Sequence, residues 1–171
     1  KDREINDLIL ERYPTLKDLQ EDYKFDLIDL LKHNTLECEK IVSSLDLDLI
    51  VVSGDGILRP SIYSQPRYGA VNFHTGINPQ YRGNSTLYWA LQNMEPEMVG
   101  YTIHRVTDTI DAGDIIYQEV VPILPSDSER TIFRRCEDSG LKKIVQIADL
   151  IEERGNEIPT IRQDLSIGRE Y

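Results

Sequence analysis

The segment from Leu47 to Ser53, with the sequence LDLIVVS, constrains the fold of this chain more than any other. It contains an apolar, β-branched run of the kind that forms a central strand of a parallel sheet, where both faces are buried. Gly54 and Gly56 follow it and let the backbone turn tightly and come close to a flat ligand. A parallel strand needs a covering helix, so the pattern favours an α/β protein.

Helical patterns precede this strand. Apolar residues recur at helical spacing within residues 4–23, and Pro14 interrupts them, which predicts two short helices or one broken helix. The run at residues 25–31 is compatible with a strand or with a helix. Asn34 followed by Glu37 forms a capping-box pattern and predicts the start of a helix.

The second half of the chain contains further elements. Asn84 or Ser85 is expected to cap a helix that ends at about Met94. Strands are predicted at residues 99–106 and 115–121, and they are antiparallel if the connection between them is a tight return.

A long helix is predicted after the last of these strands. Ser126 and Glu129 match a capping box, and Gly155 and Pro159 are expected to end the helix. The polar tail at residues 160–171 is expected only to pack on the surface.

The composition places bounds on the class of protein. The 171 residues, of which 40% are hydrophobic and 29% charged, fit a single globular domain over residues 1–171, and no internal repeat divides them. A net charge of -11 works against contact with a phosphate backbone, so we expect no nucleic acid partner. Cys38 and Cys136 make no disulfide framework or zinc motif. No membrane span or signal peptide is visible, which predicts a cytoplasmic protein. Whether it forms a homo-oligomer is left open.

Residues Ala70 to Gly83, with the sequence AVNFHTGINPQYRG, hold the strongest candidates for chemistry. Asn72 and His74 are two positions apart after a short apolar strand, so both side chains are expected on one face. An amide and an imidazole there, with a carboxylate from Asp111, could stabilise an oxyanion and manage a proton.

The order, type and spacing of several motifs resemble the folate-dependent formyltransferases, a family that includes glycinamide ribonucleotide, methionyl-tRNA and sugar-amine formyltransferases. The resemblance is close over residues 47–121. The motifs are Asn72-Phe73-His74, Pro79 with Tyr81-Arg82-Gly83, Gly100-Tyr101-Thr102-Ile103-His104 and Ile110-Asp111-Ala112-Gly113-Asp114-Ile115.

The resemblance implies a Rossmann-like formyltransferase fold, with a mainly parallel sheet and helices on both faces. It also implies site residues in three groups. The catalytic residues are Asn72, His74 and Asp111; the residues that bind 10-formyltetrahydrofolate, the co-substrate, are Gly56, Ile57, Leu58, Thr107, Asp108 and Ile110; and the residues that bind the acceptor are Tyr81, Arg82 and Gly83. No metal is expected.

The chemistry of these residue types agrees with formyl transfer. The Asn72 amide and the His74 ring could donate hydrogen bonds to the oxygen of a tetrahedral intermediate, while Asp111 could hold His74 charged or accept a proton. The residues alone leave Asp108 and Asp114 open as alternatives to Asp111.

Two further histidines and one arginine lie outside the group expected to be catalytic. His104 is expected to be structural first and to serve the site second, whereas His33 has no motif around it. Arg82 could meet an anionic or hydroxyl-rich acceptor, or it could only shape the loop.

The sequence also departs from the family. Gly76-Ile77-Asn78-Pro79 replaces the usual Ser-Leu-Leu-Pro, which leaves the acceptor open. We expect a primary amine on a small molecule, such as an amino-sugar nucleotide or glycinamide ribonucleotide, and the acidic balance disfavours methionyl-tRNA. The family's glycine-rich first unit is missing, so the N-terminal unit is expected to be incomplete. The alternatives are a formyltetrahydrofolate deformylase, which is a hydrolase, and a non-catalytic folate-binding module.

Overall fold

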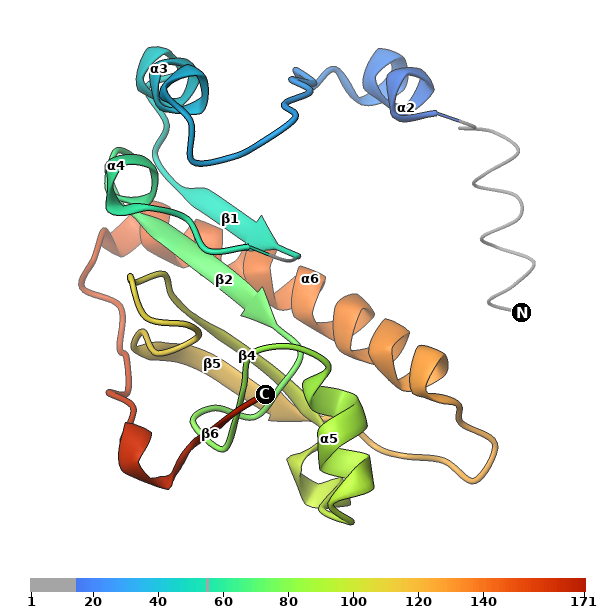
Figure 1. Cartoon of the computed structure of the whole chain (residues 1–171). Helices are drawn as coiled ribbons and strands as arrows, with labels where there is room; N and C mark the ends of the chain where they lie inside the picture. The colour runs from blue at the N-terminus through green and yellow to red at the C-terminus, as the bar shows by residue number, and fades with distance from the viewer. Residues whose placement is uncertain (1–14, 55) are drawn as a thin grey trace. The chain divides into compact units, whose positions relative to one another are not determined.

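A computed structural model of the chain describes residues 15–54 and 56–171 (Figure 1). The chain divides into two compact units, one up to His33 and one from Asn34 to Tyr171. The prediction of a single domain over the whole chain stays a prediction. Among the described residues, no helix has the length and apolar character needed to cross a membrane.

The first unit contains helix α2, Leu16–Tyr23, which agrees with the second of the two predicted helices. Thr15 caps it, because its hydroxyl accepts from the Asp18 backbone while the Asp18 carboxylate accepts from the Thr15 backbone at 2.8 Å. Lys24, in the left-handed region, ends it. The first predicted helix lies outside the described residues. Residues 25–31 form neither helix nor strand; Leu31 is fully exposed, so no packing there selects either structure.

The second unit is built on a four-stranded sheet in the order β1-β2-β4-β5. Its strands are β1, Ile50–Ser53; β2, Ala70–His74; β4, Gly100–Arg105; and β5, Ile115–Val120. Strands β1 and β2 are parallel, whereas β4 is antiparallel to both β2 and β5. The α/β class and the predicted antiparallel pair are confirmed. The sheet described here is mixed and not mainly parallel, because β4 reverses direction next to β2. Strand β1 lies at the edge of this sheet and exposes alternate residues, so it is not the buried central strand that was predicted.

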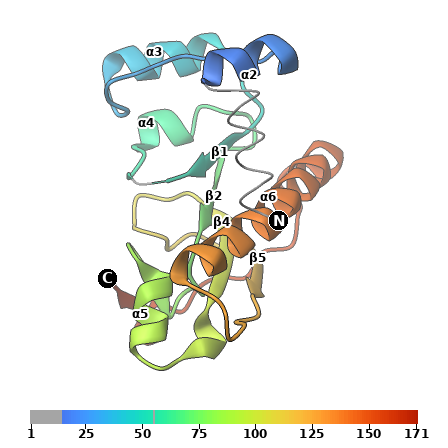
Figure 2. The same ribbon diagram turned by 90° about the vertical axis from the view of Figure 1, so that its right-hand side faces the viewer.

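Alternation along β2 divides its side chains between two faces of the sheet. Val71 and Phe73 share one face with Ile103 and Tyr101 of β4, and all four are buried in the main core. Helix α6, Glu129–Arg154, packs on this face through residues such as Cys136 and Ile144. Figure 2 shows α6 on one side of the sheet and the β4–β5 connection on the other.

This unit also contains three shorter helices, two of which have starts that were predicted from the sequence. Helix α4, Pro60–Tyr63, begins with Pro60 in its first turn, and α5, Thr86–Gln92, has Ser85 at the N-cap position without a side-chain capping bond. Helix α3, Leu36–Ser44, is capped by Thr35 and not by Asn34. The Asn34 amide instead bridges to the Ile57 carbonyl and the Arg59 backbone N–H, at 2.5 and 2.7 Å.

The start of α6 also needs a correction. Its capping box uses Ser128 and Thr131, two residues later than predicted, and the Ser128 hydroxyl accepts from the Thr131 backbone at 3.3 Å. The helix ends at Gly155 as predicted.

The C-terminal tail does more than pack on the surface. Its last strand, β6, Arg169–Glu170, pairs in parallel with β3, Tyr81–Arg82. Upstream, Ile161 and Ile115 exchange two backbone hydrogen bonds of 2.8 Å, which join the tail to the start of β5. The short 3-10 helices η1, Pro96–Met98, and η2, Leu165–Ile167, complete the unit. The tail therefore joins the segments on either side of the candidate site.

Candidate active site

Four polar side chains share the face of the sheet that α6 does not cover. Asn72 of β2 pairs in register with His104 of β4, and His74 pairs with Thr102. His74, His104 and Thr102 are buried. The predicted spacing along β2 therefore places Asn72 and His74 on one face, and the pairing of β2 with β4 places His104 beside Asn72 on the same face.

Asp111 approaches these side chains from the connection between β4 and β5. Its Oδ1 lies 3.1 Å from Asn72 Nδ2 and 3.3 Å from His104 Nε2, while its Oδ2 lies 3.3 Å from His74 Nδ1. The Gly83 backbone N–H donates to Oδ2 at 2.9 Å. One carboxylate thus contacts the amide, both rings and a backbone donor. Neither Asp108 nor Asp114 makes these contacts, and both are exposed.

The connection must fold back to bring Asp111 to this place. Because β4 is antiparallel to β2, the chain leaves β4 at the start of β2, where the Val106 N–H donates to the Ala70 carbonyl at 2.9 Å. Asn78 Nδ2 holds the Asp111 carbonyl at 2.8 Å. Gly113 lies so close to the Arg105 carbonyl that no β-carbon fits there.

The environment stabilises the charged form of Asp111. Burial opposes ionisation, but the hydrogen bond from His104, the charge of His74 and the Gly83 N–H together outweigh it and lower the pKa of Asp111 to about 2. Asp111 is therefore an anion at neutral pH.

Opposing influences act on His74. Its Nδ1 faces the Asp111 carboxylate at 3.3 Å and its Nε2 faces the Tyr81 carbonyl at 2.8 Å, and both contacts favour a doubly protonated ring. Burial acts more strongly in the other direction and lowers the pKa of His74 below 6.5. Burial therefore favours a neutral ring at pH 7, and a neutral ring can donate to only one of these two acceptors.

The six residues predicted to bind folate lie on two segments. Gly56, Ile57 and Leu58 follow β1, and the Ile57 side chain is half exposed. Thr107, Asp108 and Ile110 lie in the connection after β4 that folds back to the site, and the Ile110 carbonyl accepts from Arg82 at 3.0 Å. Asn34 fixes the first segment through the bonds described above, a role that the capping pattern did not reveal.

The three residues predicted to bind the acceptor are occupied in structural contacts. Tyr81 is fully buried and stacks on Tyr171, with ring centroids 5.4 Å apart. Arg82 is buried and donates to the Ile110 carbonyl at 3.0 Å, and Gly83 donates to Asp111. These contacts connect the three residues to Tyr171, Ile110 and Asp111. Direct binding of an acceptor stays a prediction.

Sequence reasoning missed two amide side chains at the site. Asn78 and Gln163 both donate to the Asp111 carbonyl, at 2.8 and 2.9 Å. Asn78 stood out only as a departure from the family motif. Gln163 had no signal, because a polar residue in a polar tail has no periodicity that would indicate burial.

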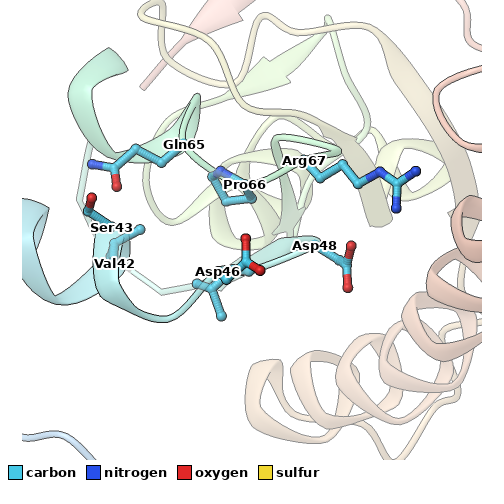
Figure 3. A pocket seen from close by; sticks show the side chains of 8 residues that line it. Val42, Ser43, Asp46, Asp48, Gln65, Pro66 and Arg67 are labelled. Atoms are coloured by element: carbon cyan, nitrogen blue, oxygen red, sulfur yellow. The ribbon is translucent and has the colours of Figure 1, made fainter.

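A hollow of about 560 Å³ lies elsewhere, before β1 and β2 begin, and shares no lining residue with the site. Figure 3 shows Asp46 and Asp48 along one side and Gln65, Pro66 and Arg67 along the other. Within residues 15–54 and 56–171, no three His, Cys, Asp or Glu side chains are grouped to hold a metal ion.

Comparison with protein families gives a match to the Formyl transferase family over residues 18–148. Methionyl-tRNA formyltransferase of Geobacter sulfurreducens is 32% identical over 139 residues, which are 81% of this chain and 44% of that protein. The enzyme of the same name from Agathobacter rectalis is 34% identical over 61% of this chain and 34% of its own. The chain thus spans less than half the length of these relatives.

Solved structures share the fold. An N-formyltransferase from Helicobacter canadensis superposes with a TM-score of 0.71 at 21% identity, over 89% of this chain and 52% of that one. The formyltransferase PseJ from Anoxybacillus kamchatkensis, in complex with a UDP-linked formamido sugar and tetrahydrofolate, gives 0.68 at 24% identity over 91% and 79%. Glycinamide ribonucleotide transformylase 1 from Symbiobacterium toebii gives 0.65 at 20% identity over 80% and 68%.

Proposed function

The chain belongs to the formyl transferase family, and we propose that it transfers a formyl group from 10-formyltetrahydrofolate to a primary amine of a small molecule. The observation that carries this proposal is the arrangement around Asp111. A partly buried carboxylate there contacts the Asn72 amide at 3.1 Å and the His74 ring at 3.3 Å. An amide, an imidazole and a carboxylate at one point are the groups that acyl transfer to an amine requires.

The reaction needs a stabilised oxyanion and a place for one proton. The amine nitrogen forms a bond to the formyl carbon, and the bond from that carbon to the folate nitrogen then breaks. The proton that the amine loses balances the proton that the folate nitrogen takes up. Between these events the formyl oxygen carries negative charge and needs hydrogen-bond donors.

Asn72 and His74 can supply these functions. Asn72 carries two N–H groups: one bonds to Asp111, while the amide nitrogen also lies 3.3 Å from His104 Nε2, a long contact that a formyl oxygen could replace. A neutral His74 can accept the proton from the amine, and the charge of Asp111 beside it stabilises the resulting imidazolium.

The segment after β1 fits a flat folate ring. Gly54 and Gly56 both have positive φ, and a β-carbon at Gly54 would meet no atom within 4 Å, so the backbone is accessible there. The half-exposed Ile57 side chain offers an apolar surface beside it. We assign this segment to the ring of the co-substrate.

A nucleotide-linked amino sugar or glycinamide ribonucleotide is the acceptor that we propose. The net charge of -11 works against binding a long nucleic acid such as tRNA. The UDP-linked sugar and tetrahydrofolate in the PseJ complex support an acceptor of this class and a folate donor.

A mass-spectrometric assay tests the proposal. The chain is incubated with 10-formyltetrahydrofolate and a panel of acceptors that contains amino-sugar nucleotides, glycinamide ribonucleotide and methionyl-tRNA. We expect one small amine to gain a formyl group and methionyl-tRNA to remain unmodified.

Other outcomes of the same assay would contradict the proposal. Formate released at an equal rate with and without amines would identify a deformylase. Binding of the folate without any product would indicate a non-catalytic folate-binding module.

A further inference from the structure

The side-chain amide of Gln163 reaches into the turn that carries Asp111. Its Nε2 lies 2.9 Å from the Asp111 carbonyl oxygen and 2.6 Å from the Gly113 carbonyl oxygen. Gln163 is 9% exposed, so water competes little for these bonds. We propose that Gln163 is a positioning residue that fixes the Asp111 turn and thereby keeps the carboxylate against Asn72 and His74.

The turn needs an external restraint because its backbone is unfavourable. Asp111 has a φ of 46°, in the left-handed region that costs a residue with a β-carbon about 1 kcal/mol or more. Such a conformation persists only where surrounding contacts determine it. The carbonyls of Asp111 and Gly113 follow this strained bond along the chain, and Gln163 holds both with one nitrogen.

The position of Gln163 is itself fixed. Two residues earlier, Ile161 exchanges two backbone hydrogen bonds of 2.8 Å with Ile115, which begins β5 just beyond the turn. The tail is therefore anchored next to the segment that Gln163 restrains, although 52 residues separate Gln163 from Asp111.

The inference rests on the proposed function, because the position of Asp111 matters for catalysis only if Asp111 acts with His74. Among the described residues, the side-chain N–H groups of Gln163 donate only to backbone carbonyls of the turn. Its loss should therefore change how Asp111 acts on its neighbours and should not remove a group from the reaction.

The test compares Gln163→Met, which keeps the length of the side chain and removes its N–H donors, with Asp164→Ala. Asp164 caps η2 in the same tail, accepting from the Ser166 backbone at 3.0 Å, so its replacement controls for general loosening. We expect Gln163→Met to lower kcat about 10- to 100-fold with little change in KM, because a displaced Asp111 supports the reaction poorly. The control should keep the parental kcat.

A second readout does not depend on activity. The groups that face His74 are Asp111, the Tyr81 carbonyl and His104, whose ring centroid lies 6.3 Å away. The charge of Asp111 raises the pKa of His74, so a displaced Asp111 should lower it further. A histidine NMR titration measures this shift, and the chain has only three histidines.

The two readouts separate the possible failures. A titration of His74 that is identical in the parent and in Gln163→Met would overturn the positioning role, even if kcat fell. If the parent forms no product, the proposed function fails, while the titration still decides the role of Gln163. Gln163→Leu, which also lacks an N–H donor, repeats the test if the Met variant does not fold.

Discussion

At the scale of single residues, Asp111 is the point at which the site comes together. Its carboxylate contacts three side chains and one backbone N–H, and its carbonyl accepts from two amides, Asn78 and Gln163. A buried charge is stable only when its partners are complete, so removing the charge should have a measurable effect on stability.

We expect Asp111→Asn to change how stability depends on pH. The folded-state pKa of about 2 lies below the ordinary 3.8, so the carboxylate stabilises the fold above about pH 4, and this contribution disappears as the pH falls through 2. Between pH 5 and pH 2 the parent should lose about 1–2 kcal/mol more unfolding free energy than the variant. Urea unfolding across this range measures both. Parallel curves for the two proteins would show that Asp111 is not a stabilised anion.

At the scale of elements, α6 packs against the face of β2 opposite to the candidate site. Gly140 of α6 lies directly against the ring of Phe73, and a β-carbon at position 140 would come within 2.8 Å of Phe73 Cδ2. Phe73 stands between Asn72 and His74 on the opposite face of β2. The helix therefore helps to fix the position of the strand that carries the candidate site.

We expect Gly140→Ala to destabilise the chain by about 1–3 kcal/mol, because overpacking against Phe73 outweighs the better helix propensity of alanine. Thermal and urea unfolding measure the change. Phe73→Leu in the Gly140→Ala background should recover part of the loss, since the smaller side chain gives room to the new methyl group. A more stable Gly140→Ala variant would show that the helix can move away from the sheet at no cost.

Elements with a local signal were predictable from the sequence. The β-branched run at Leu47–Ser53 contains β1, Ile50–Ser53, and the spacing of Asn72 and His74 places both on one face of β2. The central, fully buried position predicted for this run was wrong, because β1 lies at the edge of the described sheet. The direction of β4 relative to β2 was not predictable, because pairing depends on contacts distant in sequence. Helix starts were wrong by one or two residues, since several Ser, Thr and Asn side chains compete for the cap.

The same distinction between local and distant contacts applies to the candidate site. Asn72 and His74 belong to one strand, so local periodicity brings them together. The meeting of Asp111 with His74 was expected only from the family resemblance, because a loop of that length has no pattern that gives its path. The contact of Gln163 with the turn depends on the tail's pairing with β5, which the sequence does not show.

At the scale of the whole molecule, the candidate site of the second unit is assembled from segments that are distant in the sequence. Strands β2 and β4 supply the amide and the rings, the β4–β5 connection supplies the carboxylate, and the tail restrains that connection. Since the chain spans less than half of its curated relatives, its activity is the property that most needs direct measurement.

The most direct measurement is the single-turnover rate of formyl transfer from 10-formyltetrahydrofolate to the acceptor found in the panel. It compares the parent with His74→Ala and with His33→Ala, a matched control in the other unit of the chain. We predict that His74→Ala lowers the rate about 100- to 1,000-fold, because the group that accepts the proton of the amine is lost, and that His33→Ala keeps the parental rate. A His74→Ala rate equal to the parental rate would contradict the assignment of this cluster as the active site.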